Sequence, residues 1–206
     1  MMQAYGAADP RHLAPEPAQR DTLATIVAAT PWLMRALRAV RSLALPGSGC
    51  IGAGAVRSTV WDSLHGLSSP APLADVDVAY FDPSDLSPEA EATHQRRLTG
   101  LVPELHWEVV NQAAVHLWYE RTFGRSVPPL DSLEEGIASW PETATAVAVR
   151  LDDRDQVQVL APLGLIDLFE CIVRRNPTRV DEGTFRARVE AKRYAERWPR
   201  VRVVWD

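Results

Sequence analysis

Two residue types with distinctive chemistry are nearly absent from this sequence. Lys192 is the single lysine among 22 Lys and Arg residues, so a reaction that needs a side-chain amine has one internal candidate. The only cysteines, Cys50 and Cys171, lie far apart and match no metal-ligand spacing. So little cysteine is typical of a protein from a reducing compartment.

Long hydrophobic runs and clusters of basic charge are also missing. No apolar run reaches the roughly 18 residues that can span a membrane, and residues 1–20 lack the apolar stretch of a secretory signal. We therefore expect a cytoplasmic protein with no membrane partner. The net charge is −5. It does not favour an extended nucleic-acid duplex as a partner, because phosphate neutralisation needs clustered Lys and Arg.

The composition that remains is that of a soluble globular domain, with 46% hydrophobic and 24% charged residues. Hydrophobic periodicity and turn residues predict helices interleaved with strands. Strands are expected at 50–53, 75–81, 106–110, 143–151 and 156–160, and helices at 32–45, 54–65, 87–105, 112–122, 133–139, 163–175 and 181–198. We therefore predict an α/β (α+β) fold with a mixed β-sheet of about five strands flanked by helices. A single domain is expected over residues 21–206, after a flexible leader over 1–20.

Two acidic residues stand at the start of a predicted strand. Asp75 and Asp77 alternate with Val76 and Val78, and alternation along a strand places both carboxylates on one face, about 7 Å apart at Cα. Two like charges on one face of an apolar strand repel each other, and a divalent cation removes that repulsion. The alternative is an edge strand with a solvated acidic face.

A glycine-rich turn precedes this strand in the sequence. A short strand enters a helix through Gly52 and Gly54, and such a turn allows a backbone to approach a phosphate at a helix start. Arg57 and Ser58 fall in the first helical turn, where they would add side-chain donors. The alternative is a tight packing turn between strand and helix.

Other polar residues have both a binding and a structural interpretation. Arg188 and Lys192 lie four residues apart on one face of the last predicted helix, and they would either contact a phosphate or form a solvated face. Asn111 is expected to cap a helix, with a substrate contact as the alternative.

Two further motifs are set aside. Residues 47–52 spell G-x-G-x-x-G, but a helix precedes them and a strand follows, which is the reverse of a dinucleotide-binding turn. His106 and Glu108 have the spacing of a zinc deaminase motif, but no P-C-x-x-C accompanies them.

The combination of glycine turn and Asp-x-Asp strand resembles the nucleotidyltransferase superfamily that includes DNA polymerase β. The chain is more closely similar to a bacterial family of uncharacterised nucleotidyltransferase-like proteins over roughly residues 30–204. The similar segments are 53–62, 72–82, 107–113, 140–146 and 162–169. Two departures from the superfamily pattern are Ala55, where a serine is common, and a longer interval between Gly54 and Asp75.

The resemblance implies a nucleotidyltransferase fold and a metal-dependent reaction. A nucleoside monophosphate would pass from a nucleoside triphosphate to an unknown acceptor, with release of pyrophosphate. The metal would be Mg²⁺ (or Mn²⁺). The resemblance implies that the catalytic residues and metal ligands are Asp75, Asp77 and Glu108. The expected nucleotide-binding residues are those of the glycine turn and the nearby cations, namely Gly52, Gly54, Arg57, Ser58 and Lys192.

Alternatives to this interpretation stay open at the level of sequence. Glu108 is the candidate for the third carboxylate of the superfamily because it lies on a neighbouring strand, and Asp62, Asp82 and Glu142 are its rivals. A non-catalytic nucleotide-binding or interaction protein on the same fold would lack the third carboxylate. The third alternative is an unrelated hydrolase that uses the acidic pair and a metal, and pyrophosphate formation is the observation expected to separate it from a transferase.

Overall fold

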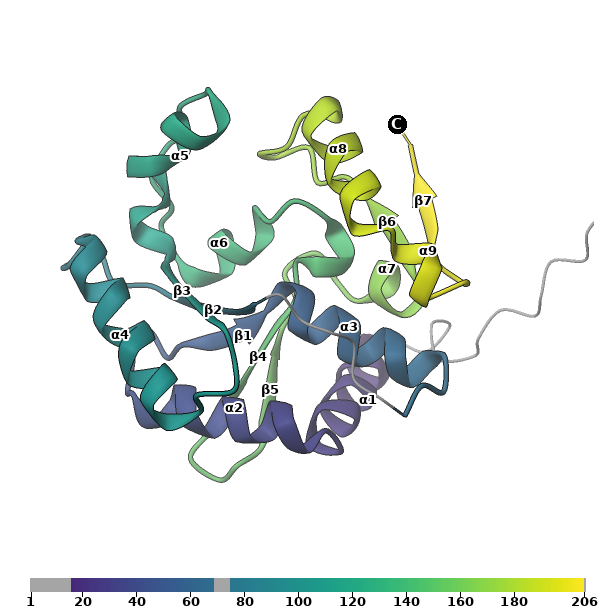
Figure 1. Cartoon of the computed structure of the whole chain (residues 1–206), viewed down its shortest axis with the longest axis horizontal. Coiled ribbons are helices and arrows are strands. Elements are labelled where there is room, and N and C mark those ends of the chain that lie inside the picture. Colours follow the sequence, from purple (N-terminus) through teal and green to yellow (C-terminus); the bar gives the residue numbers. More distant parts are fainter. Residues whose placement is uncertain (1–15, 69–74, 206) are drawn as a thin grey trace, which may run out of the picture.

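The computed structural model describes residues 16–68 and 75–205. A mixed sheet with the strand order β3-β2-β1-β4-β5 lies at its centre, as predicted (Figure 1). Strands β2 and β3 are parallel, and the other neighbours are antiparallel. The strands are β1 (Cys50–Gly52), β2 (Val76–Tyr80), β3 (Trp107–Asn111), β4 (Ala148–Leu151) and β5 (Val157–Leu160).

Helices cover both faces of this sheet, with α1 and α2 on one side and α5, α6 and α8 on the other (Figure 1). The longer helices are α1 (Glu16–Ala28), α2 (Pro31–Ser42), α3 (Ala53–Leu64), α4 (Pro88–Leu101), α5 (Val115–Phe123), α6 (Leu133–Ala138) and α8 (Glu182–Lys192). The shorter elements are the 3₁₀ turns η2 (Gln112–Ala114) and η3 (Thr143–Thr145), helices α7 (Ile166–Phe169) and α9 (Tyr194–Arg197), and strands β6 (Ile172–Arg174) and β7 (Arg202–Val204).

The alternation of strand β2 divides its side chains between the two faces of the sheet. Val76, Val78 and Tyr80 are buried in the main core together with residues of α1, α2 and α3. Ala79 faces the other way and packs in a smaller cluster with Leu133 and Ile137 of α6. Odd-numbered positions of β2 therefore face α6, and this is the face on which the acidic residues lie.

Helices α3 and α8 are anchored very differently. Most residues of α3 are buried, including Trp61 in its last turn. In α8 only Phe185 is buried, although the side chain of Asp181 caps the helix by accepting the Thr184 backbone N–H at 2.7 Å. Helix α3 is thus part of the core, whereas α8 lies on it.

The region after residue 142 differs most from the sequence-based prediction. The helix expected at 163–175 was wrong: α7 ends at Phe169, and Ile172–Arg174 form β6, paired parallel to β7. Cys171 adopts a left-handed φ of 55°, which interrupts the helical path. Arg193, with φ 48°, likewise separates α8 from α9, and the strand expected from 143 begins only at Ala148, after η3.

The amino-terminal boundary also differs from the expected one. Helix α1 begins at Glu16, and Arg20 donates a hydrogen bond to the Val159 carbonyl of β5 at 2.9 Å. The rest of the expected leader, 1–15, lies outside the described residues, as does the segment 69–74 before β2. Among the described residues no single helix is long and apolar enough to cross a membrane, although α1 and α2, bent by 96° at their break, pass on length and composition as a pair.

Candidate functional site

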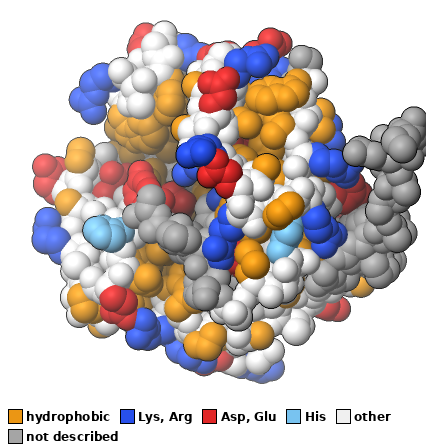
Figure 2. Space-filling model, turned by 45° about the vertical axis from the view of Figure 1, so that its right-hand side comes forward, with side chains coloured by type: hydrophobic (Ala, Val, Ile, Leu, Met, Phe, Trp, Pro, Cys, Tyr) orange, Lys and Arg blue, Asp and Glu red, His pale blue; other side chains and the backbone are white. Residues whose placement is uncertain are grey.

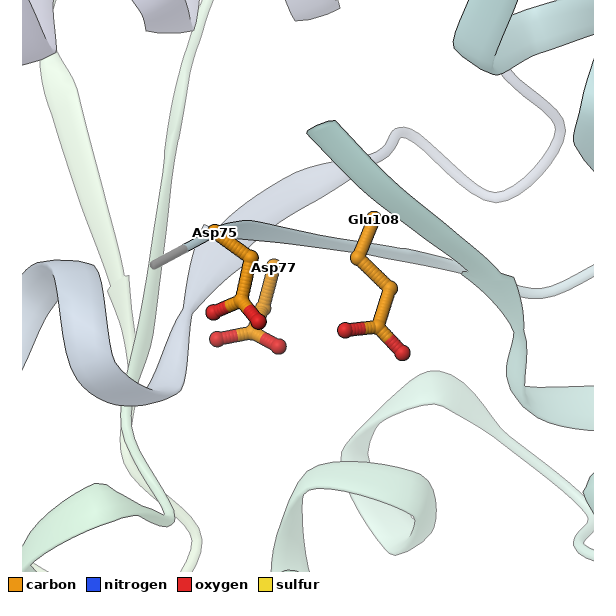
Figure 3. Close-up of side chains that lie close together, drawn as sticks. All are labelled: Asp75, Asp77 and Glu108. Atoms are coloured by element: carbon orange, nitrogen blue, oxygen red, sulfur yellow. The ribbon is translucent and has the colours of Figure 1, made fainter. Parts of the chain in front are cut away.

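Three carboxyl groups meet on the face of the sheet that is turned towards α6. Asp77 and Glu108 are direct partners in the parallel register of β2 and β3. Asp75 stands two positions before Asp77 and therefore points to the same face. Each of the three offers an oxygen within 4.8 Å of the others, and Figure 3 shows the carboxyl groups directed to one side of the ribbon. The expected proximity of Glu108 to the aspartate pair is therefore found.

The negative charges of this cluster are poorly compensated. Burial raises the pKa of Asp77 to about 6, with further contributions from the charges of Asp75 and Glu108. Burial and the charge of Asp75 also raise the pKa of Glu108. An all-oxygen set of carboxylates is what Mg²⁺ and Mn²⁺ prefer, and a divalent cation would remove the repulsion. The cluster therefore fits such an ion.

The two glycines of the turn before α3 have different environments. A Cβ at Gly52 would lie 2.5 Å from ring carbons of Trp140, so glycine is needed there for packing. At Gly54 a Cβ would meet only Arg57 Nη2, at 3.9 Å. The Gly54 N–H donates to the Asp77 carboxylate. The start of α3 thus contacts the acidic cluster through Gly54, whereas Gly52 is held in a tight packing turn.

A cavity of about 450 Å³ opens above the acidic cluster. In the space-filling view this face is hollowed, with hydrophobic side chains beside the hollow and acidic ones at its edge (Figure 2). Arg57, Arg188 and Lys192 line one part of the cavity. The cavity therefore joins the carboxylates to the cations that the sequence singled out on α3 and α8.

Arg188 is held by a buried carboxylate. Its Nε donates to Glu142 Oε1 at 2.8 Å, and Glu142 is fully buried. The Tyr194 hydroxyl also donates to Glu142, at 2.9 Å. Arg57 Nη1 donates to the same hydroxyl at 3.3 Å. We call the part of the cavity lined by Arg57, Arg188 and Lys192 the cation wall. Glu142 orients this wall through Arg188 and Tyr194 and lies outside the acidic cluster.

Arg57 is more enclosed than a solvent-facing residue in the first turn of a helix would be. It is 5% exposed, and its guanidinium carbon lies 4.8–5.6 Å from the ring centroids of Trp61, Tyr194 and Trp198. Arg57 Nη2 also donates to Ser58 Oγ at 3.2 Å. Ser58 is buried and does not line the cavity, so its hydroxyl is directed to Arg57.

The other rivals for the third carboxylate have partners of their own. Asp62 accepts hydrogen bonds from Arg197 Nε at 2.9 Å and Trp198 Nε1 at 2.8 Å. Asp82 accepts from Ser84 within a turn. Asn111 caps η2 by accepting from the Ala113 N–H at 3.1 Å, as expected. Glu108 is therefore the acidic residue that joins Asp75 and Asp77.

The remaining wall of the cavity was missed at the level of sequence. It consists of apolar and aromatic side chains of α5 with two arginines from elsewhere. The residues that line it include Val115, Trp118, Tyr119, Phe123, Arg125, Arg179 and the acidic Asp181. The crowding of Trp118, Tyr119 and Phe123 within six residues was a signal, but the sequence alone did not distinguish a cavity wall from core packing.

Comparison with known proteins agrees with this geometry. A family model described as "Nucleotidyltransferase" matches residues 38–203. A structure described as "The NMR structure of the protein reveals a CCA-adding enzyme head domain" superposes with a TM-score of 0.72 at 25% identity, over 90% of this chain and 96% of that one. Structures described as "tRNA-processing enzyme (apo form I)" and "The complex structure of CCA-adding enzyme with CTP" give TM-scores of 0.46 and 0.48 at 18% and 14% identity, over 84% and 98% of this chain and 43% and 44% of theirs. No curated protein sequence matches the chain.

Proposed function

The chain belongs to this nucleotidyltransferase family, and we propose that it is a metal-dependent enzyme that transfers a nucleoside monophosphate from a nucleoside triphosphate to an acceptor hydroxyl, with release of pyrophosphate. The observation that carries the proposal is the meeting of Asp75, Asp77 and Glu108 beside the start of α3. The family and the fold support nucleotide transfer in general terms. The metal, the roles of the residues and the acceptor hydroxyl belong to the proposal.

The metal would be held by Asp75, Asp77 and Glu108. Bound there, Mg²⁺ or Mn²⁺ would neutralise charge on the phosphates and on the attacking and leaving oxygens. The Gly54 N–H donates to the Asp77 carboxylate and so helps to orient it. The third carboxylate, Glu108, favours catalysis over the non-catalytic alternative, because it faces Asp77 in strand register.

The triphosphate would bind the cations that line the cavity. Arg188 and Lys192 line the cavity from α8, and Arg57 lines it from α3. Charge-assisted hydrogen bonds from guanidinium groups suit phosphate oxygens. Arg188 Nε donates to the buried Glu142 carboxylate, and this bond fixes the orientation of the guanidinium and of its other two nitrogens. The three cations would bind the β- and γ-phosphates, which leave as pyrophosphate.

The chemical step is a single displacement at phosphorus. The oxygen of the acceptor hydroxyl forms a bond to the α-phosphorus, and the bond from that phosphorus to the bridging oxygen of the β-phosphate breaks. Pyrophosphate leaves with the bonding electrons. The hydroxyl proton passes to the Glu108 carboxylate, which acts as the general base.

Manganese binding tests the proposal without knowledge of the acceptor. Titration of Mn²⁺ followed by electron paramagnetic resonance should show a site in the wild type that is lost or greatly weakened in Asp77→Asn. Asp153→Asn, in the exposed turn between β4 and β5, is the matched control and should bind like the wild type. Equal affinity in Asp77→Asn and the wild type would refute the metal site, whatever the activity.

A further inference from the structure

The cavity above the carboxylates has two unlike ends. The cations Arg57, Arg188 and Lys192 line it from α3 and α8, and Trp118, Tyr119 and Phe123 line it from α5, which lies apart from α8 in Figure 1. Glu108 lies on β3, which is one of the two edge strands of the five-stranded sheet and is followed by η2 and α5. The residue proposed to receive the proton of the acceptor is therefore on the side of the aromatic end.

The aromatic end contains a buried cation whose hydrogen bonds are incomplete. Arg179 is 7% exposed, and its Nη1 has no hydrogen-bond partner in the described part of the chain. Its Nη2 donates to the Pro128 carbonyl at 3.3 Å, and its guanidinium carbon lies 5.5 Å from the centroid of the Tyr119 ring. The Tyr119 hydroxyl donates to the Arg179 carbonyl at 2.6 Å. The cavity wall thus holds this guanidinium, and one of its nitrogens, which is itself shielded from solvent, has no hydrogen-bond partner in the described part of the chain.

A buried guanidinium with an unsatisfied N–H is costly unless an anion completes it. Glu135 interacts electrostatically with Arg179. The two side chains form no salt bridge in the described part of the chain. Arg125 lines the same end and lies 6.0 Å from the centroid of the Tyr119 ring. Two guanidinium groups over one ring, at the rim of an apolar wall, are complementary to a ligand that carries both an anion and a flat ring.

We propose that Trp118, Tyr119, Phe123, Arg125 and Arg179 form the acceptor subsite, and that the acceptor is a small molecule with a planar ring, a hydroxyl and one anionic group. This inference rests on the proposed function, since it assigns the other substrate of that reaction. The ring packs on the α5 wall, and the anion, a phosphate or a carboxylate, binds Arg179 and Arg125.

Model acceptors test the subsite directly. Calorimetry on the full chain with Mg²⁺ would compare 4-hydroxyphenyl phosphate, 4-hydroxybenzoate and phenol. We expect the anionic probes to bind more tightly than phenol, and the stronger of the two identifies the anion as phosphate or carboxylate. Arg179→Gln should weaken the anionic probes by about tenfold and leave phenol binding unchanged. Equal binding of all three probes, or no binding of any, would overturn the proposal.

Two variants guard against a folding effect. Arg125 is exposed, so Arg125→Gln should fold normally and still weaken the anionic probes severalfold. Arg121→Gln is the matched control, because Arg121 lies four residues before Arg125, is exposed as well and does not line the cavity. If Arg121→Gln weakens the probes as much as Arg125→Gln does, the attraction is general and the subsite is refuted.

A non-hydrolysable nucleoside triphosphate separates this inference from the proposed function. The analogue and the anionic probe should bind together, each without displacing the other. Displacement of the probe would assign the aromatic wall to the nucleobase and overturn the acceptor subsite while leaving the transferase proposal intact. Failure of the analogue to bind with Mg²⁺ would count against the proposed function, whether or not the probe binds. A single-stranded oligonucleotide can also be tested as a competitor of the anionic probe. If it displaces the probe from the wild type but not from Arg179→Gln, the acceptor is a nucleic-acid strand and the small-molecule proposal is overturned.

Discussion

The floor of the cavity and its cation wall are built in different ways. The floor consists of Asp75, Asp77 and Glu108, whose positions follow from two strands in register. The cation wall depends on Glu142, Tyr194 and residues of α3 and α8 that come from distant parts of the chain. The floor is therefore fixed by backbone pairing, and the wall by side-chain bonds that single substitutions can break. A substitution in the floor should change chemistry, whereas one in the wall should change stability and phosphate binding.

The largest effect is expected for a floor residue. Asp77→Asn should lower nucleotide transfer by about a thousandfold, because a lost carboxylate ligand forfeits several kcal/mol of charge stabilisation in the transition state. Pyrophosphate release from a nucleoside triphosphate is the measurement. Asp153→Asn should retain wild-type turnover, and a wild-type rate in Asp77→Asn would show that the floor does not perform the chemistry.

A wall residue should show the converse behaviour. Glu142→Gln removes the carboxylate that binds Arg188 and Tyr194, and breaking a largely buried pair lowers the free energy of unfolding by about 3 kcal/mol. Urea denaturation measures this change, and Mn²⁺ affinity should stay close to that of the wild type. Glu134→Gln, at an exposed position of α6, is the matched control. Loss of Mn²⁺ binding in Glu142→Gln would mean that floor and wall are one unit.

The pH dependence of the free energy of unfolding of the metal-free protein reports on the burial and charge repulsion of the Asp77 carboxylate. The pKa of Asp77 is raised from 3.8 to about 6 in the folded state, so the folded chain holds this proton more tightly than the unfolded chain. The free energy of unfolding should therefore fall as the pH rises through this interval and stay lower above it.

Asp77→Asn removes this dependence. It should stabilise the metal-free protein by about 2 kcal/mol at pH 8, after allowance for partial exposure of the side chain, and should have little effect near pH 4. Thermal or urea unfolding at the two pH values, in chelator, measures the difference. The same stabilisation in Asp153→Asn, or at both pH values, would exclude the carboxylate repulsion as its source.

The smallest effect is expected at Ser58. Its hydroxyl accepts from Arg57 Nη2 and does not line the cavity, so Ser58→Ala acts on nucleotide only through the arginine. Loss of one hydrogen bond of that kind corresponds to a change of about threefold to tenfold in triphosphate affinity. Calorimetry with a non-hydrolysable triphosphate would measure it. A hundredfold loss would show that the hydroxyl itself binds phosphate.

The same difference explains how much the sequence could predict. Alternation placed Asp75 and Asp77 on one face, and the neighbouring strand supplied Glu108, because short-range backbone geometry determines all three. The five-stranded sheet followed from the same periodicity. Gly54 was predicted as part of a phosphate turn, and it contacts the acidic cluster through the Asp77 carboxylate; its role in nucleotide binding stays a prediction.

The sequence singled out Arg57, Arg188 and Lys192, but the contacts that hold the walls of the cavity together could not be predicted, because their residues meet only in the folded chain. Arg57 was expected as a donor in the first turn of a helix, but rings from α3 and the region of α9 enclose it. The break at Cys171 depends on a left-handed backbone that no local pattern announced. Arg179 gave no signal either, since its burial against Tyr119 joins segments sixty residues apart in the sequence.

The shallow anchoring of α8 has a consequence for the order in which the molecule comes apart. Because Phe185 is its one buried residue, α8 can detach in a local fluctuation that leaves the deeply embedded α3 intact. Backbone amides of α8 should then exchange with deuterium far sooner than those of α3. Triphosphate that bridges Arg188 and the start of α3 would slow exchange in α8 selectively. The helix that supplies Arg188 and Lys192 would thus open and close in a local unfolding equilibrium of its own, and bound triphosphate would shift that equilibrium towards the closed state.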